Sequence, residues 1–162
     1  MVTVETARLA ELETVTDLWV SLAREQRERG SRLAAERNRS AMRAAIAAHH
    51  ENEGVIVARD GERLVGFATV TREGRGLVTD ADRALLSNLY VVSDRRDEGI
   101  GTVLLEAVEE RCREWGVSSV TLEVLAANED ARRFYTERGY DIHRLRLERS
   151  LAESDTHTTG ER

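Results

Sequence analysis

The sequence contains no proline and no lysine, so all 24 of its basic side chains are arginines. The lack of lysine excludes a Walker-type phosphate loop, which requires Gly-Lys-Ser/Thr. A single cysteine, Cys112, excludes an internal disulfide and a metal cage of several thiolates. There is also no apolar run near ~18 residues, and we therefore expect no transmembrane helix.

Charge and length narrow the class of protein further. The formal net charge is −6, and no basic stripe of the kind used to bind nucleic acid is visible. The N-terminal residues lack the basic and apolar regions of a signal peptide, so we expect a cytoplasmic protein that binds neither nucleic acid nor membrane. With 162 residues, we expect one domain over 1–151, followed by a disordered polar tail at 152–162.

Hydrophobic periodicity predicts alternating strands and helices in a mixed sheet with helices on both faces. The predicted strands lie at 3–7, 55–58, 64–71, 87–92, 118–124 and 140–147, and Asp60-Gly61 indicates a hairpin between the second and third. The predicted helices begin near 9, 39, 100 and 129. Because a helix joins 87–92 to 118–124, these strands should be parallel neighbours. Apolar residues on both faces of 118–124 favour a place at the sheet centre.

The most informative stretch is the turn between the strand at 87–92 and the helix at 100–115. Gly99 and Gly101 let the main chain approach a ligand closely. The first N–H groups of the helix have no acceptor within it and lie at the positive end of its dipole, which suits a phosphate or pyrophosphate. Arg95 and Arg96 add side-chain charge, although either is also consistent with an ordinary surface arginine.

Two phosphate-binding designs remain after the Walker loop is excluded. A dinucleotide fingerprint needs glycine or alanine where Leu104 stands, and too few residues follow Val124 for the remaining strand–helix units. The other design is the R-x-x-G-x-G turn from Arg96 to Gly101. Downstream, the sequence continues with Leu122-Glu123-Val124, Asn128, Phe134-Tyr135 and Gly139-Tyr140.

Together these motifs resemble the GNAT superfamily of N-acetyltransferases, with spacing similar to that of ribosomal-protein N-terminal alanine acetyltransferases and their relatives. The good match covers roughly residues 85–147. The resemblance implies an α/β (α+β) fold with a mainly antiparallel, mixed central sheet of six to seven strands in a three-layer α/β/α arrangement. It also implies acetyl-CoA as cosubstrate, and no metal.

The resemblance further implies which residues bind coenzyme A. The pyrophosphate would be held by Arg95, Arg96, Asp97, Glu98, Gly99, Ile100, Gly101 and Thr102. The pantetheine arm would add like a strand to the edge formed by Leu89, Tyr90, Val91 and Val92, with help from Asn128 and Tyr135. A backbone N–H near Val91 would polarise the thioester carbonyl.

Two side chains are candidates for proton transfer. An aliphatic amine with a pKa near ~10 is almost wholly protonated at neutral pH, and Glu123 is our candidate base, directly or through water. Its apolar strand neighbours predict partial burial and a raised pKa. Tyr135 occupies the position of the family's general acid. The plainer alternatives are an arginine-paired carboxylate for Glu123, core packing for Tyr135 and a simple helix cap for Asn128.

The resemblance leaves the acceptor open. A protein or peptide N-terminus, a small polyamine-like or amino-acid amine, and an aminoglycoside-like molecule all fit, and residues 24–39 and 73–86 should shape their pocket. We expect a monomer or a homodimer. The alternative functions are a non-catalytic acyl-CoA-binding or regulatory domain and, less favoured, a nucleotide-binding module.

Overall fold

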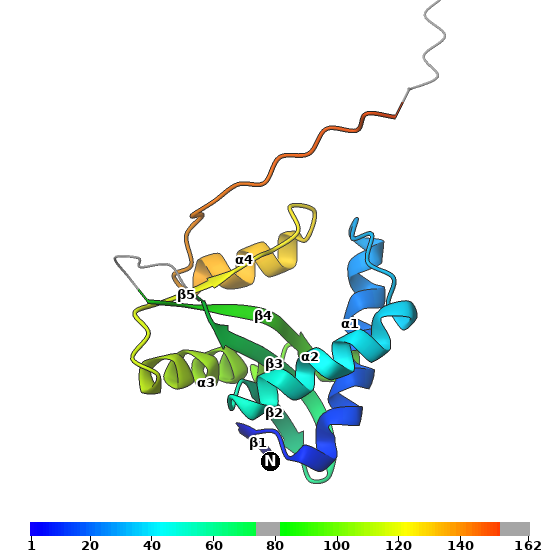
Figure 1. Ribbon diagram of the computed structural model, residues 1–162. Coiled ribbons are helices and arrows are strands. Elements are labelled where there is room, and N and C mark those ends of the chain that lie inside the picture. Colours follow the sequence, from blue (N-terminus) through cyan, green and yellow to red (C-terminus); the bar gives the residue numbers. More distant parts are fainter. Residues whose placement is uncertain (74–81, 153–162) are drawn as a thin grey trace, which may run out of the picture. The chain divides into compact units, whose positions relative to one another are not determined.

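The computed structural model describes residues 1–73 and 82–152 (Figure 1). The chain forms two compact units, Met1–Asn128 and Glu129–Arg162, and each is described by itself. Apart from Ala152, the tail predicted at 152–162 lies outside the described residues. Over the two described ranges, no helix is both long and apolar enough to cross a bilayer.

The first unit is a sheet with helices on both faces. In chain order its elements are β1 (Val2–Thr6), η1 (Leu9–Glu11), α1 (Leu12–Glu28), η2 (Glu36–Asn38), α2 (Arg39–Glu51), β2 (Val55–Asp60), β3 (Arg63–Arg72), β4 (Arg83–Val91), η3 (Ser93–Arg95), α3 (Ile100–Glu114) and β5 (Ser119–Leu122). The strand order is β1-β2-β3-β4-β5. The first three pairings are antiparallel, and β4 runs parallel to β5, which confirms the predicted mixed sheet and its parallel pair.

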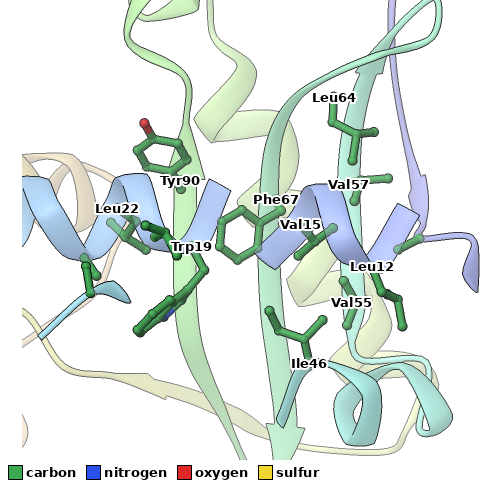
Figure 2. Packing of buried hydrophobic residues seen from close by; sticks show 14 residues of the cluster. Leu12, Val15, Trp19, Leu22, Ile46, Val55, Val57, Leu64, Phe67 and Tyr90 are labelled. Carbon is green, nitrogen blue, oxygen red and sulfur yellow. The ribbon is translucent and has the colours of Figure 1, made fainter. Parts of the chain in front are cut away.

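The larger hydrophobic cluster lies between the sheet and α1, with α2 packed beside α1 (Figure 2). Leu12, Val15 and Trp19 project from one face of α1 at three- and four-residue spacing, as the sequence predicted. They pack in one cluster with Val57 of β2 and Phe67 of β3. Burial of one such side chain contributes roughly 1.5–3 kcal/mol, so this layer holds α1 firmly against the sheet.

Helix α3 covers the opposite face. Successive strand residues point to opposite faces, and Phe67 lies in the α1 cluster. Its neighbour Gly66 faces α3, because a Cβ there would lie 2.9 Å from Cδ1 of Leu104 and 2.8 Å from the carbonyl oxygen of Tyr90. The absence of a side chain at Gly66 therefore lets the first turns of α3 lie close to β3 and β4, which fixes where that helix begins.

The prediction of six to seven strands is wrong for the described residues, which form five. Tyr140–Leu147 forms no strand, and its apolar residues do not keep one period: Ile142 and Leu145 are three positions apart, so in a regular strand they would face opposite sides. The strand predicted at 118–124 spans only Ser119–Leu122 and is the outermost strand instead of a central one. It is only half-buried, so apolar residues on both faces were a poor guide to its place.

Local boundaries differ more modestly. Asp60 pairs with Arg63, so the hairpin turn is formed by Gly61 and Glu62, one residue later than predicted. Gly61 has a φ of +60°, which explains the glycine. Strand β4 begins at Arg83, earlier than predicted, and residues 74–81 of the expected loop lie outside the described residues.

The second unit contains one helix, α4 (Glu129–Glu137), which confirms the short helix predicted there. It ends near Gly139, whose φ is +87° and whose N–H donates to the carbonyl oxygen of Thr136 at 3.2 Å. Beyond it, 140–152 form neither helix nor strand.

Candidate active site

The turn that precedes α3 has the geometry of an anion site. Gly99 is the residue before the helix and has a left-handed backbone with φ 82° and ψ 5°. No side chain caps this helix end, and its first turn carries no acidic residue. A Cβ added to Gly99 would meet nothing within 4 Å, so the space in front of the turn is open. The start of α3, where the positive end of the helix dipole lies, can therefore receive an external anion.

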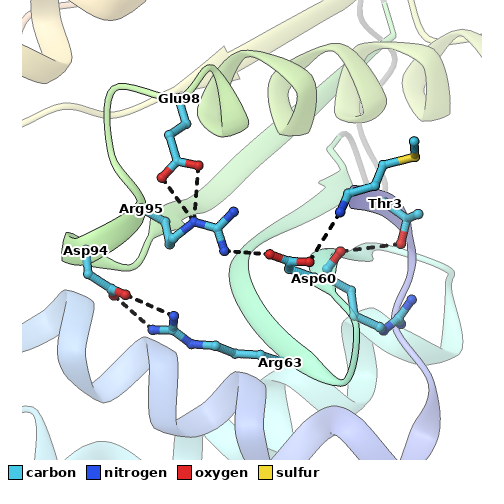
Figure 3. A network of polar contacts seen from close by, with 8 residues as sticks. Thr3, Asp60, Arg63, Asp94, Arg95 and Glu98 are labelled. Carbon is cyan, nitrogen blue, oxygen red and sulfur yellow. Dashed lines mark hydrogen bonds and ion pairs between the residues drawn. The ribbon is translucent and has the colours of Figure 1, made fainter.

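Arg95 is held by carboxylates on both sides. Its Nε donates to the two carboxylate oxygens of Glu98 at 3.1 and 3.0 Å, and its NH1 donates to Asp60 Oδ2 at 2.8 Å (Figure 3). The hydrogen bond from Arg95 lowers the pKa of Asp60. Beside this contact, Arg63 donates to both oxygens of Asp94 at 2.9 Å. Arg95 thus anchors the turn to the β2–β3 hairpin.

Arg96 connects the same turn to α1 and to the end of β4. Its NH2 donates to the carboxylate oxygens of Glu25 at 3.0 and 2.7 Å, and its Nε donates to the carbonyl oxygen of Val91 at 3.1 Å. The guanidinium carbon lies 5.6 Å from the ring centroid of Tyr90, within cation–π range. Sequence reasoning missed Glu25, because nothing in the Arg- and Glu-rich stretch of α1 distinguishes it.

Strand β4 separates from β5 just before this turn. The parallel pairs run from Arg83↔Ser119 to Leu86↔Leu122, whereas β4 continues to Val91. At the same place the register with β3 shifts, because Leu86 pairs with Val70 and Asn88 with Thr69, which leaves Ser87 as a bulge. A bulge bends its strand and can end pairing on one side. The bulge was not predicted, because it depends on how β4 pairs with β3.

The open part of β4 presents backbone groups to a ligand. The N–H of Val92 donates to the carbonyl oxygen of Val65 at 2.9 Å, so this pair is hydrogen-bonded. Such pairs alternate along an antiparallel ladder. The N–H and C=O groups of Leu89 and Val91 therefore point away from β3, toward the side where β5 has ended. The carbonyl oxygen of Val91 already accepts from Arg96 Nε. The two N–H groups and the carbonyl oxygen of Leu89 therefore form the short edge to which an extended chain can add.

The other predicted binding residues are placed as follows. Tyr90 is buried among the α1-facing residues, and burial raises the pKa of its phenol. Val92 packs partly buried against the same cluster, and Ile100 is buried at the start of α3. Asp97 has a left-handed backbone with φ 61°. Because Tyr90 and Ile100 are buried, binding along this stretch would rely on the backbone more than on these side chains.

The two catalytic candidates belong to different compact units. Glu123 follows the last residue of β5 and is exposed, so the partial burial predicted for it is wrong. Tyr135 lies on α4, where its ring centroid is 5.1 Å from that of Phe134 and 5.6 Å from that of Tyr140. Burial raises the pKa of Tyr135 to about 12. Asn128 ends the first unit, and its N–H donates to the carbonyl oxygen of Leu125 at 2.9 Å.

Within residues 1–73 and 82–152, no three His, Cys, Asp or Glu side chains are grouped so that they could hold an ion. Coenzyme A, in contrast, fits the residues present. The open space before Gly99 and the uncapped start of α3 suit a pyrophosphate, and the free edge at Leu89 and Val91 suits an amide-bearing arm.

Comparison with known proteins identifies the family. The model of the Acetyltransferase (GNAT) family matches residues 12–140, and the chain belongs to this family. YxbD, an uncharacterized protein of Bacillus subtilis, is 33% identical over 95 residues, which are 59% of this chain and 54% of YxbD. An uncharacterized N-acetyltransferase of Mycobacterium tuberculosis is 32% identical over 92 residues, 57% of this chain and 55% of that protein. The chain thus spans about half the length of the curated relatives it matches.

Solved structures share the fold. A transcriptional regulator from Bacillus halodurans C-125 is 25% identical, with a TM-score of 0.73 over 93% of this chain and 100% of that one. An aminoglycoside N-acetyltransferase in complex with CoA is 16% identical, with a TM-score of 0.72 over 94% of this chain and 96% of that one. At this identity the second likeness concerns the fold alone. The predicted GNAT resemblance is confirmed, and the likeness to ribosomal-protein acetyltransferases stays a prediction.

Proposed function

We propose that this chain is an N-acetyltransferase that transfers an acetyl group from acetyl-CoA to a primary amine by direct attack in a ternary complex. The observation that carries this proposal is the free edge of β4 at Leu89 and Val91, adjoining the uncapped start of α3. These two features lie next to one another in the chain. A ligand with a diphosphate at one end and an extended amide arm at the other matches both.

The backbone supplies most of the binding in this proposal. The N–H groups of the turn from Arg96 to Thr102 hold the pyrophosphate, and the N–H and C=O groups of Leu89 pair with the pantetheine arm. The N–H of Val91 then donates to the carbonyl oxygen of the reacting group and stabilises the negative charge that develops there. When bound, acetyl-CoA supplies the acetyl group as a thioester.

Two side chains, Glu123 and Tyr135, carry out the proton transfers in this proposal. Glu123 accepts the proton that the ammonium must lose before attack, directly or through water. Tyr135 donates a proton to the departing sulfur, and its pKa of about 12 keeps the phenol protonated at every physiological pH. Asn128 hydrogen-bonds the pantetheine arm. Because Glu123 is exposed, water relay is the form of base catalysis that we favour for it.

The acceptor belongs to one of three classes: a peptide N-terminus, a small polyamine-like or amino-acid amine, or an aminoglycoside-like amine. The third class is included because one solved GNAT structure is described as an aminoglycoside N-acetyltransferase. The described parts of the expected acceptor pocket are residues 24–39, which include the end of α1 and η2, and residues 73 and 82–86, which include the start of β4.

Release of free thiol from acetyl-CoA, measured with one amine of each class, tests the proposal. We expect turnover with at least one class, saturation in both substrates, and acetylated amine in equal amount to thiol by mass spectrometry. Turnover that requires a covalent acetyl-enzyme would contradict direct attack. A denatured sample and the amine without protein serve as controls.

A non-catalytic regulatory domain is the second candidate, because the neighbour from Bacillus halodurans is described as a transcriptional regulator and Glu123 lacks the predicted burial. Calorimetric titration separates the two. If CoA binds but acetyl-CoA releases no thiol with any of the three amines, the chain is better explained as a regulatory domain. NAD titrated in the same way tests the nucleotide-binding module, for which we expect no binding heat.

A further inference from the structure

The last turn of α1 reaches the free edge of β4. Figure 2 shows this helix crossing the sheet from β2 toward β4, where Leu22 lies beside Tyr90. Glu25 follows on the helix and contacts Arg96 at 2.7 Å. Arg29 comes one turn later, roughly 6 Å along the axis, which is comparable with the roughly 4.8 Å between neighbouring strands. The end of α1 therefore extends past β4, toward the side where β5 has ended.

Arg29 lies on the face of α1 that looks toward the sheet. Leu22, Glu25 and Arg29 are three and four residues apart, so they share one face of the helix. Leu22 is buried in the cluster beneath α1, which identifies that face. Arg29 is half-buried, yet its side chain makes no hydrogen bond or ion pair with any residue that the structure describes. A guanidinium in such a place suits the carboxylate of a ligand, which it can bind through two parallel hydrogen bonds.

The backbone at the end of α1 holds Arg29 in a defined position. Gly30 has a left-handed backbone with φ 102°, and its N–H donates to the carbonyl oxygen of Arg27 at 3.2 Å. The N–H of Ser31 donates to the carbonyl oxygen of Gln26 at 3.0 Å. These two hydrogen bonds form the Schellman motif, which ends a helix on a left-handed glycine. Arg29 is thus presented by a fixed turn.

The charge of the surrounding segment also favours an anion. Residues 24–39 contain six arginines and three glutamates, a formal charge of +3 in a chain whose net charge is −6. Two of the glutamates are already paired, Glu25 with Arg96 and Glu36 with Arg24. A local excess of positive charge attracts ligands with a negative group and repels ligands with several positive ones.

We propose that Arg29 binds a carboxylate of the acceptor. The acceptor is then an amino acid or a peptide N-terminus that carries a carboxylate near its reacting amine. This inference rests on the proposed acetyl transfer and narrows its substrate class. Polyamine-like and aminoglycoside-like amines lack a carboxylate and add positive charge to a positive segment, so they should be poor acceptors.

Acceptors that differ by one carboxylate provide the test. Glycine is compared with glycinamide, and glutamyl-alaninamide with glutaminyl-alaninamide, so the two pairs also separate an amino acid from a peptide. In at least one pair, the ratio of the two kcat/KM values should fall at least about tenfold in Arg29→Gln, the effect of one charge-assisted hydrogen bond. Comparing this ratio between proteins cancels the difference in amine pKa within a pair. Arg29→Lys should keep part of the preference.

Two further variants separate a direct contact from general attraction. Arg113→Gln removes an equal charge from α3, on the opposite face of the sheet, where the side chain is 66% exposed. It should leave the ratio unchanged. Arg37→Gln removes a charge from an exposed position within 24–39 and should change the ratio less than about twofold.

Calorimetry with the CoA-loaded protein measures the same preference without turnover. In at least one pair, the acceptor with the carboxylate should bind at least about tenfold more tightly to the natural protein, and this advantage should disappear in Arg29→Gln. If no amine is acetylated but this binding preference is present, the transferase proposal fails and the carboxylate site stands.

Several results would overturn the proposal. Equal binding within both pairs would do so, as would equal losses of preference in Arg29→Gln and Arg37→Gln, or faster acetylation of spermidine than of any of the four matched acceptors. A loss of CoA affinity in Arg29→Gln would assign Arg29 to a phosphate of the cofactor instead. Circular dichroism of each variant checks that it is folded.

Discussion

Asp97 adopts a left-handed backbone conformation, with φ 61°, in the middle of the turn that precedes α3. A non-glycine residue pays roughly 1–2 kcal/mol there, whereas glycine adopts the conformation freely but loses more entropy on folding, by roughly 0.5–1 kcal/mol. We therefore expect Asp97→Gly to raise the free energy of unfolding by up to about 1 kcal/mol in chemical denaturation. The lost carboxylate should also tighten CoA binding, because a negative charge beside the start of α3 competes with an anion.

Glu53 provides the matched control for this prediction, because it too has a left-handed backbone, with φ 60°, but lies between α2 and β2. Glu53→Gly should stabilise the protein to a similar extent and leave the CoA dissociation constant unchanged in calorimetry. Weaker CoA binding in Asp97→Gly would show that its carboxylate assists the site.

The role proposed for Tyr135 as the general acid can be tested by substitution. If the phenol protonates the departing sulfur, Tyr135→Phe should lower kcat roughly a hundredfold while the KM for acetyl-CoA changes little. With its pKa at about 12, the phenol stays protonated below pH 10, so an alkaline fall in activity below that pH must come from another group. Tyr140→Phe, which alters the neighbouring ring, should retain activity. A Tyr135→Phe enzyme with normal kcat would reduce Tyr135 to a packing role.

The raised pKa of Tyr135 also makes the stability of the protein depend on pH. A phenol with a folded pKa above its unfolded value of 10 contributes stability that is complete below pH 10 and lost as the pH rises toward 12. Thermal denaturation between pH 9 and 12 should therefore show a steeper decline for the natural protein than for Tyr135→Phe. Parallel curves for the two proteins would contradict the burial of this hydroxyl.

At the scale of elements, Glu25 couples α1 to the anion-binding turn through Arg96. This pair is partly exposed, at 29% and 40%, so its contribution to stability should stay below about 1 kcal/mol. Glu25→Gln should instead act on binding: the KM for acetyl-CoA should rise roughly two- to fivefold, with kcat nearly unchanged, because Arg96 loses one of the contacts that hold the turn beside Val91. Glu28→Gln, an equal charge change on the exposed side of α1, should leave KM unchanged. Equal KM values in all three proteins would show that the turn is ordered without α1.

The elements that the sequence predicted well are those with a strong local signal. The apolar period of α1, the helix after Gly99 and the hairpin near Gly61 all follow from patterns within one segment. The bulge at Ser87 and the early end of β5 depend on contacts between strands, and a single sequence does not record them. The backbone edge at Leu89 and Val91 could be placed only after the hydrogen bond of Val92 fixed the alternation. Likewise, Glu123 has apolar neighbours in sequence but an exposed place in the fold, because β5 is an edge strand.

At the scale of the whole molecule, a protein whose only strong cations are arginines uses them in two different ways. Several lie in largely exposed ion pairs, such as Arg43 with Glu13, whose side chains are 32% and 67% exposed. Arg59 is different, because its side chain is only 6% exposed and joins β2 to Glu5 of β1 and to Glu11 of η1. The contacts to Glu11 measure 2.6 and 2.9 Å, and Nε finds no acceptor among the described residues. This partly buried cluster links the first strand and the start of α1 to the sheet.

Arg59→Met leaves Glu11, whose side chain is 15% exposed, charged in a poorly solvated place, whereas Glu5 is 52% exposed and stays hydrated. The substitution should therefore lower the free energy of unfolding by up to about 3 kcal/mol. Arg43→Met, an identical change at an exposed pair, should cost less than about 1 kcal/mol. Urea denaturation at pH 7 measures both. Because Arg59 lies between β2, β1 and η1, the fully folded fraction of Arg59→Met should keep its CoA affinity. Equal losses of stability in the two variants would mean that water reaches Arg59 in solution, and a loss of CoA affinity in the folded protein would mean that the first strand helps to position the turn before α3.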